Sequence, residues 1–154
     1  MLVVNAGRTG VERGAYQGAN AAGIPVTGFM RQAARDELGK LPPELAQRLT
    51  PCPGRSKRLP VQRAVDTAAA VLVLVPDPDD VSAFPVVQYV LKQARREARP
   101  VRVCAADGPS DDVLAWLRAA GTVYITGPRE TRWPPGVSIA RRLIRALGPA
   151  EAIA

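Results

Sequence analysis

The sequence predicts an α/β fold in which helices cover both faces of a mostly parallel five-stranded sheet. Short apolar segments alternate with longer segments of helical periodicity, and one apolar segment, 70–75, is a continuous run typical of a strand buried on both faces. The length of 154 residues and the hydrophobic content of 47% suit one domain with its own core. We therefore expect residues 1–154 to form a single three-layer, Rossmann-like domain.

The predicted strands and helices alternate along the chain. Strands are expected at 2–5, 24–29, 70–75, 100–105 and 122–126. Helices are expected at 9–22, 59–69, 82–98, 110–120 and 135–147, with shorter helical turns at 32–38 and 43–48. Gly23 is placed to end the first helix, and Ser82 and Ser110 are placed to cap two later helices. Ligands of such sheets bind beyond the carboxyl ends of the strands, here the loops at 5–9, 28–32, 76–82, 105–110 and 126–135.

Composition excludes several classes of function. The chain has no histidine, which removes Ser-His-Asp catalysis, Cys-His catalysis and nearly every zinc site. The net charge of +7 comes mainly from arginine, which suits bidentate contacts with phosphate or carboxylate, so a small anionic ligand is expected. Nucleic acid is not expected as a partner, because the few aromatic residues are not interleaved with basic ones as in a base-stacking platform.

Targeting features favour the cytoplasm. No apolar run approaches the ~20 residues of a membrane span, and the start of the chain lacks the basic region and cleavage site of a signal peptide. Cys52 and Cys104 lie far apart and form no CxxC pair, which is typical of two unrelated thiols. We expect a cytoplasmic protein without a membrane partner.

The loop between the first strand and the first helix carries the strongest local motif. Its sequence, Asn5-Ala-Gly-Arg-Thr-Gly-Val-Glu-Arg13, has glycines that permit close backbone approach and arginines that add positive charge. Free amides at a helix start favour an anion. Thr9 and Glu12 also have the Thr-x-x-Glu spacing of a capping box, so capping alone is the competing interpretation. The loop contains neither the Gly-x-Gly-x-x-Gly fingerprint nor a Walker A motif.

Two motifs resemble those of the molybdenum carrier proteins, also called molybdenum cofactor carriers. That family begins with a strand and Ser-Gly-Gly-Gln-Thr-Gly-Val-Asp-Arg, which loop 5–13 resembles, and a helix and Gly-Ile-Pro follow, as in Gly23-Ile-Pro25. Near its end the family has Gly-Pro-Arg-Glu-Ser and then Pro-Gly, and this chain has Gly127-Pro-Arg-Glu-Thr131 and Pro135-Gly136. The resemblance covers essentially the whole chain.

The chain departs from that family after its central strand. The family carries a Gly-Gly-Thr loop there, and this chain has Pro76-Asp-Pro-Asp-Asp-Val-Ser82. The acidic side chains should lie near the site, repel an anion and favour a monophosphate over a triphosphate. A Mg²⁺ site is the alternative, although such a cluster is more often a solvated turn, and no metal ion is expected. The family's helix with Arg-Thr-Glu is also poorly matched in this chain, and Arg58 or Arg63 is the candidate to replace its arginine.

The resemblance implies a Rossmann-like fold related to the LOG and DprA-type nucleotide-binding proteins, and binding of molybdenum cofactor, a pterin phosphate, without its transformation. We therefore expect a binding or carrier protein for a phosphorylated heterocycle, either molybdenum cofactor or a nucleotide, with no catalytic residues. A LOG-like nucleotide phosphoribohydrolase enzyme is an alternative, but its Pro-Gly-Gly-x-Gly-Thr-x-x-Glu motif is missing at 76–82. A degenerate paralogue that no longer binds a ligand is another.

The predicted site joins the loop after the first strand to the loop after the last. Arg129 would clamp a phosphate and Glu130 would orient it or bind a ribose hydroxyl, the alternative being a turn with an internal ion pair. Trp133 is a candidate to stack on a planar ligand, and an anion is expected at the amides of Thr9 and Gly10. The predicted cofactor-binding residues are Gly7, Arg8, Thr9, Gly10, Arg13, Gly127, Arg129, Glu130 and Trp133.

The resemblance also implies a homo-oligomer. The closing helix has apolar positions broad enough to serve both the core and a subunit interface. These positions are Val137, Ile139, Leu143, Ile144 and Leu147.

Overall fold

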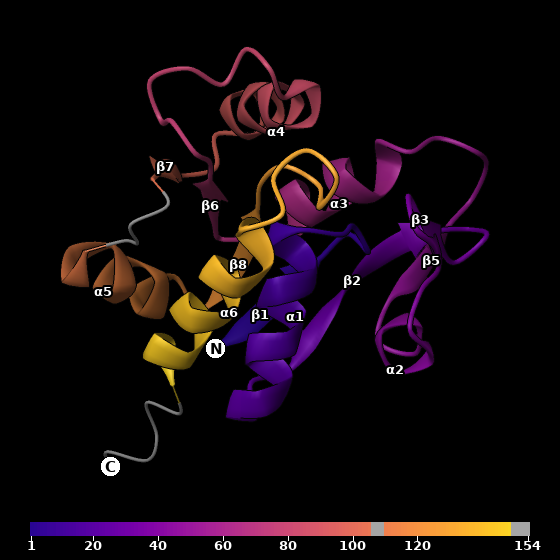
Figure 1. Ribbon diagram of the computed structural model, residues 1–154, viewed down its shortest axis with the longest axis horizontal. Coiled ribbons are helices and arrows are strands. Elements are labelled where there is room, and N and C mark those ends of the chain that lie inside the picture. Colours follow the sequence, from indigo (N-terminus) through magenta and orange to yellow (C-terminus); the bar gives the residue numbers. More distant parts are fainter. Residues whose placement is uncertain (106–109, 149–154) are drawn as a thin grey trace.

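A computed structural model describes residues 1–105 and 110–148, and its centre is a six-stranded parallel sheet (Figure 1). The strand order is β5-β2-β1-β8-β6-β7, and every neighbouring pair is parallel. The strands are β1 (Leu2–Asn5), β2 (Val26–Arg31), β5 (Thr50–Cys52), β6 (Ala70–Leu74), β7 (Val101–Cys104) and β8 (Thr122–Thr126). The Rossmann-like α/β class is therefore confirmed, with one strand more than predicted.

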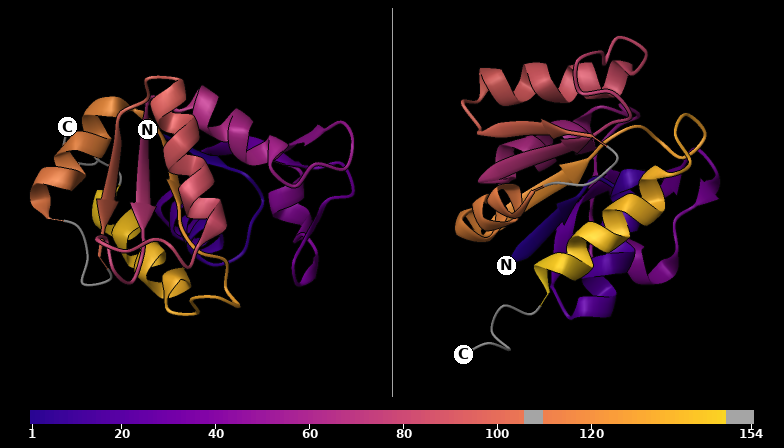
Figure 2. Two further views of the ribbon diagram at one scale, coloured as in Figure 1. Left: turned by 90° about the horizontal axis from the view of Figure 1, so that it is seen from above. Right: turned by 60° about the vertical axis from the view of Figure 1, so that its left-hand side comes forward.

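Helices cover both faces of this sheet (Figure 2). They are α1 (Val11–Ala22), α2 (Pro43–Ala46), α3 (Leu59–Thr67), α4 (Pro85–Arg96), α5 (Asp111–Ala120) and α6 (Gly136–Leu147). Alternate strand residues explain the two layers: Val3 and Leu72 pack with α1, α5 and α6, whereas Val4 and Val71 pack with α3 and α4. All five residues of β6 are buried, as its continuous apolar run predicts.

The first and last strands of the chain, β1 and β8, are neighbours in the middle of the sheet. β1 lies between β2 and β8, so α1, which follows β1, packs against α6, which follows β8. Gly14 and Gly18 face α6, and a Cβ atom at Gly14 would overlap the carbonyl oxygen of Val137. Glycine at these positions lets the two helix backbones approach closely.

Segment 30–58 differs from its prediction. A helical turn was expected at 32–38, but β3 (Arg35–Asp36) and β4 (Gly39–Lys40) form an antiparallel hairpin there. The short helix expected at 43–48 is present as α2. β5, which was not predicted, pairs with β2 at the sheet edge, where Pro51 is tolerated.

Two helix starts also differ. α1 begins at Val11, after Gly10 with φ of 76°, and no side chain caps it, so the competing interpretation of Thr9 and Glu12 as a capping box is wrong. The Glu12 carboxylate is fully buried instead. α4 begins at Pro85, three residues after the Ser82 predicted to cap it. The predictions for Gly23 and Ser110 are confirmed: Gly23 ends α1 in the left-handed conformation, and the Ser110 hydroxyl accepts from the Val113 amide.

Two further expectations concern membrane-spanning helices and the ligand-facing loop at 105–110. In the part of the chain that the structure describes, no helix has the length and apolar character needed to cross a membrane. The loop predicted at 105–110 as one of the ligand-facing loops falls mostly on 106–109, which lie outside the described residues.

Candidate anion-binding site

A cavity of about 320 Å³ opens at the carboxyl edge of the sheet. The loops after β1 and β8, the β3–β4 hairpin and the segments that begin α3 and α4 all contribute to it. Its cations are Arg8, Arg31, Arg35, Lys57, Arg58, Arg129 and Arg132, and its only carboxylates among the described residues are Asp36 and Glu37. An apolar wall completes the lining, made of Ala6, Val61, Ala83, Phe84, Pro85, Val86, Val87 and Pro128.

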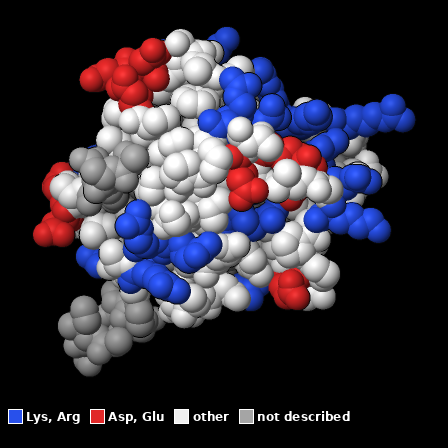
Figure 3. Space-filling view, viewed as in Figure 1, with Lys and Arg blue, Asp and Glu red and all other residues white. Residues whose placement is uncertain are grey.

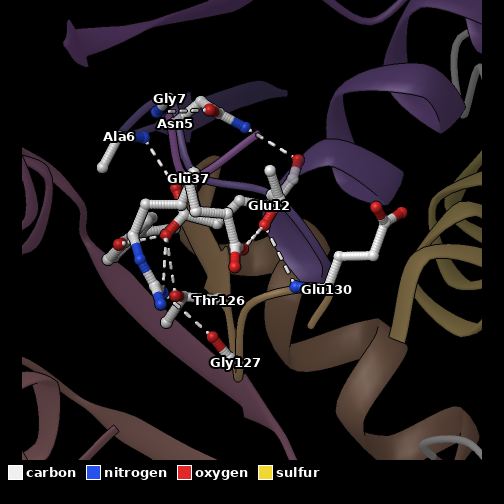
Figure 4. A network of polar contacts seen from close by, with 11 residues as sticks. Asn5, Ala6, Gly7, Glu12, Glu37, Thr126, Gly127 and Glu130 are labelled. Atoms are coloured by element: carbon white, nitrogen blue, oxygen red, sulfur yellow. Dashed lines mark hydrogen bonds and ion pairs between the residues drawn. The ribbon is translucent and has the colours of Figure 1, made fainter. Parts of the chain in front are cut away.

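The buried carboxylate of Glu12 organises the floor below this cavity (Figure 4). Its Oε1 accepts from the Ala6 amide at 2.7 Å, and its Oε2 accepts from the hydroxyls of Tyr124 at 2.7 Å and Thr126 at 2.9 Å. Burial, together with the Glu12 charge, raises the pKa of the Tyr124 phenol well above its ordinary value, so this phenol stays a donor. The network ties α1 to the first and last strands.

Arg8 lies between this floor and the cavity. Its Nη1 is 3.5 Å from Oε2 of Glu12 and donates to the carbonyl of Gly127 at 2.9 Å. The guanidinium is thus held in place by one carboxylate and one carbonyl, and part of its charge is already balanced.

The loops after β1 and β8 are in direct contact. The amide of Glu130 donates to the Thr9 hydroxyl at 3.0 Å. Gly10 has a positive φ, and a Cβ atom there would overlap the carbonyl oxygen of Pro128. The second loop therefore packs on the first through backbone, and glycine is required at position 10.

The β3–β4 hairpin closes one side of the cavity with two acidic residues. Asp36 pairs with Arg13 of α1 at 2.5 Å. The Glu37 carboxylate accepts from the hydroxyls of Thr9 and Thr131, and its Oε2 lies 3.5 Å from Nε of Arg129. Both acids of the lining are thus engaged in ion pairs.

The structure divides the nine predicted site residues into three groups. Gly7, Arg8, Thr9 and Arg129 line the cavity. Gly10, Gly127 and Glu130 lie behind it and contribute backbone contacts between the two loops. Arg13 and Trp133 are outside the lining: Arg13 is bound to Asp36, and Trp133 is buried in the core, with 8% of the residue exposed and its ring beside Gly136. Trp133 is therefore not placed to stack on a ligand in this cavity.

The acidic turn at 77–80 does not line the cavity, contrary to the expectation that it restricts the site. Its three aspartates are exposed, and two of them accept hydrogen bonds within the turn: Asp77 accepts from the Asp79 amide, and Asp80 accepts from the amide and hydroxyl of Ser82. The Ser82 hydrogen bonds lower the pKa of Asp80. Figure 3 shows acidic side chains over the β6–α4 connection, apart from the basic side chains around the hairpin. Within 1–105 and 110–148, no group of three acidic or cysteine side chains could hold a metal ion.

Several lining residues were missed by sequence reasoning. Arg31, Arg35, Glu37 and Lys57 come from the segment 30–58, which carries no recognisable motif, and Arg58 is the one candidate that the sequence offers there. Arg31 could have been suspected, because it stands within one of the loops expected to face a ligand.

The parallel sheet between two helix layers defines a Rossmann-like protein. The chain belongs to the circularly permutated YpsA SLOG family, whose sequence profile matches residues 3–147. It is similar to a "putative molybdenum carrier protein" from Syntrophus aciditrophicus SB, whose crystal structure was solved at 1.45 Å resolution. The two chains share 18% identity and a TM-score of 0.82, over 95% of this chain and 93% of that one, so the likeness shows a shared fold. No curated protein matches the sequence.

Proposed function

We propose that this protein binds a phosphorylated heterocycle, molybdenum cofactor or a nucleotide, in the cavity at the carboxyl edge of the sheet. The observation that carries the proposal is the lining itself, in which cations face an apolar wall. Among the described residues, five of the seven cations have no carboxylate within salt-bridge distance, the exceptions being Arg8 and Arg129. Such a cavity can hold a phosphate and an aromatic ring side by side.

The apolar wall provides the place for the ring. Phe84 and Val61 lie on it, and the partly exposed Phe84 offers an aromatic surface for stacking. Arg31 and Arg35, from the end of β2 and the hairpin, would then hold the phosphate by charge-assisted hydrogen bonds.

Binding without transformation is the function we favour over catalysis. Arg13 and Arg129 form ion pairs with the two carboxylates of the lining. Glu12 is buried below the cavity, where its carboxylate already accepts hydrogen bonds. The described part of the lining therefore offers no unengaged general base. A relative that is itself named a carrier has the same fold, which supports a carrier role here.

Differential scanning fluorimetry and calorimetric titration test this proposal with matched probes. We expect adenosine and guanosine monophosphates to raise the Tm and bind more tightly than adenosine or inorganic phosphate alone, because each half fills only part of the cavity. Arg31→Gln should lower nucleotide affinity about tenfold, the effect of losing one charge-assisted hydrogen bond. The control is Arg142→Gln on the exposed side of α6. Equal binding of adenosine and its monophosphate, or no effect of Arg31→Gln, would contradict the proposal.

A further inference from the structure

A second hollow, of about 360 Å³, lies between α3 and α4. Three cations line it, Arg58, Lys92 and Arg96, together with the side chains of Gln62, Gln88 and Tyr89. No carboxylate of the described residues is in this lining. Like the first cavity, it combines positive charge with an aromatic ring and therefore suits an anion that carries a heterocycle.

The two hollows adjoin one another. Arg58 and Pro85 line both of them, Arg58 from the residue before α3 and Pro85 from the first turn of α4. The Arg58 guanidinium carbon lies 4.8 Å from the centre of the Tyr89 ring, which holds its charge at the border between the hollows. A ligand that fills the first cavity can thus continue past Arg58 into the second.

The walls of the second hollow are held by polar contacts. Gln93, which is 4% exposed, donates to the Asp66 carboxylate at 3.1 Å, and the Tyr89 hydroxyl is 3.4 Å from the Gln62 amide oxygen. These contacts join α3 to α4 across the groove. Among the described residues, neither Lys92 nor Arg96 has a carboxylate within salt-bridge distance, so their charges are available to a ligand.

We propose that the ligand is a dinucleotide: two phosphorylated heterocycles joined through a diphosphate that lies beside Arg58. This proposal rests on the function proposed above and extends it. Each hollow is at the lower end of the roughly 300–1,000 Å³ typical of small-ligand sites, so each suits one half of such a molecule. Each also has its own aromatic side chain, Phe84 in the first and Tyr89 in the second. The diphosphate carries two negative charges, which suit Arg58 at the border and the adjacent Lys57 of the first cavity.

Calorimetric titration with three related probes tests this inference on the full chain. The probes are FMN, AMP and FAD, which is FMN and AMP joined through a diphosphate. We expect FAD to bind at least about tenfold more tightly than either half. The double variant Lys92→Gln/Arg96→Gln should lower FAD affinity about tenfold. It should leave unchanged the affinity for the mononucleotide that Arg31→Gln weakens, because that mononucleotide lies in the first cavity. Arg95→Gln, at an exposed position of the same helix outside the lining, is the matched control.

The outcomes separate the two proposals. If a mononucleotide binds and FAD binds no better, or if the double variant weakens FAD and the mononucleotide equally, the dinucleotide proposal is wrong and the proposed function stands. If none of the three probes binds, a nucleotide is excluded as the ligand of the proposed function, and the dinucleotide proposal fails with it.

Discussion

Nε of Arg129 lies 3.5 Å from Oε2 of Glu37, so the arginine predicted to clamp a phosphate faces a carboxylate of the protein itself. That carboxylate also accepts from the hydroxyls of Thr9 and Thr131. Glu37 thus lies among the groups that sequence reasoning assigned to an external anion. A ligand phosphate at this position must either displace Glu37 or bind beside it.

Glu37→Gln should therefore tighten anion binding. Two like charges ~4 Å apart repel by about 4 kcal/mol at an effective dielectric of 20, and the substitution removes one of them while keeping the side-chain shape. We expect the affinity for AMP and for inorganic phosphate to rise by about tenfold or more in calorimetric titrations. Glu44→Gln, on the exposed side of α2, is the control. Unchanged affinity in Glu37→Gln would show that an anion does not bind near Arg129.

Glu12→Gln should destabilise the fold. The new amide group would point a donor at groups that already donate, and Arg8 would lose its carboxylate partner. We expect a loss of about 2–4 kcal/mol in the free energy of unfolding, measured by urea denaturation. Glu130→Gln is the matched control, because that carboxylate points away from the network (Figure 4), and its effect should stay within about 0.5 kcal/mol. Equal effects of the two variants would rule out this role of Glu12.

Thr9→Ala should loosen the contact between the loops after β1 and β8. The change removes the acceptor of the Glu130 amide, and we expect a loss of about 1 kcal/mol in stability. Hydrogen exchange at the Glu130 amide should accelerate, and Thr9→Ser, which keeps the hydroxyl, should restore the wild-type rate. Unaltered exchange in Thr9→Ala would mean that this hydroxyl does not join the loops.

The stability of the fold should fall at alkaline pH, in part through Tyr124. The pKa of this phenol is raised in the folded state, so the unfolded chain loses the proton first. The contribution is constant below the unfolded value of about 10 and diminishes as the pH rises above it. In denaturation series, Tyr124→Phe should therefore lose less stability between about pH 9 and 11 than the wild type. Parallel pH profiles of the two proteins would contradict this.

A homo-oligomer stays a prediction, and the structure argues against the α6 surface that was expected to form its interface. Four of the five apolar positions of α6 proposed for it are buried within the single chain, namely Ile139, Leu143, Ile144 and Leu147. We therefore expect any interface to use another surface, so that Arg142→Glu on the exposed side of α6 leaves the assembly intact. Sedimentation equilibrium at micromolar concentration checks the assembly, and a single species of 16.4 kDa would refute it.

Most of the sheet could be predicted because its strands are marked by local sequence. Apolar runs such as 70–75 identify strands buried on both faces, and glycines and serines identify the ends of some helices. β5 has no such mark: Thr50-Pro-Cys52 is neither alternating nor apolar, and it becomes a strand only because the edge of β2 is available. The hairpin around Asp36 likewise depends on Arg13, a partner more than twenty residues earlier.

The candidate site could be predicted only where motifs exist. Arg8, Thr9 and Arg129 were found because they stand in two recognisable loops. Glu37 and Lys57 lie in a segment without motifs, and their position follows from tertiary packing. Glu12 shows a further limit, because its spacing from Thr9 has the form of a capping box while its carboxylate serves the core.

Because β8 lies in the middle of the sheet, the sheet and the floor of the candidate site cannot be complete until β8 has been synthesised. The hydroxyl donors of Glu12 on Tyr124 and Thr126 follow it by 112 and 114 residues, so they leave the ribosome long after α1 does. Until β8 arrives, β1 has one open edge and Glu12 lacks both hydroxyls. If this edge binds the proposed ligand, a nascent chain halted before β8 would still lack part of the floor of the site, however well its first half had folded.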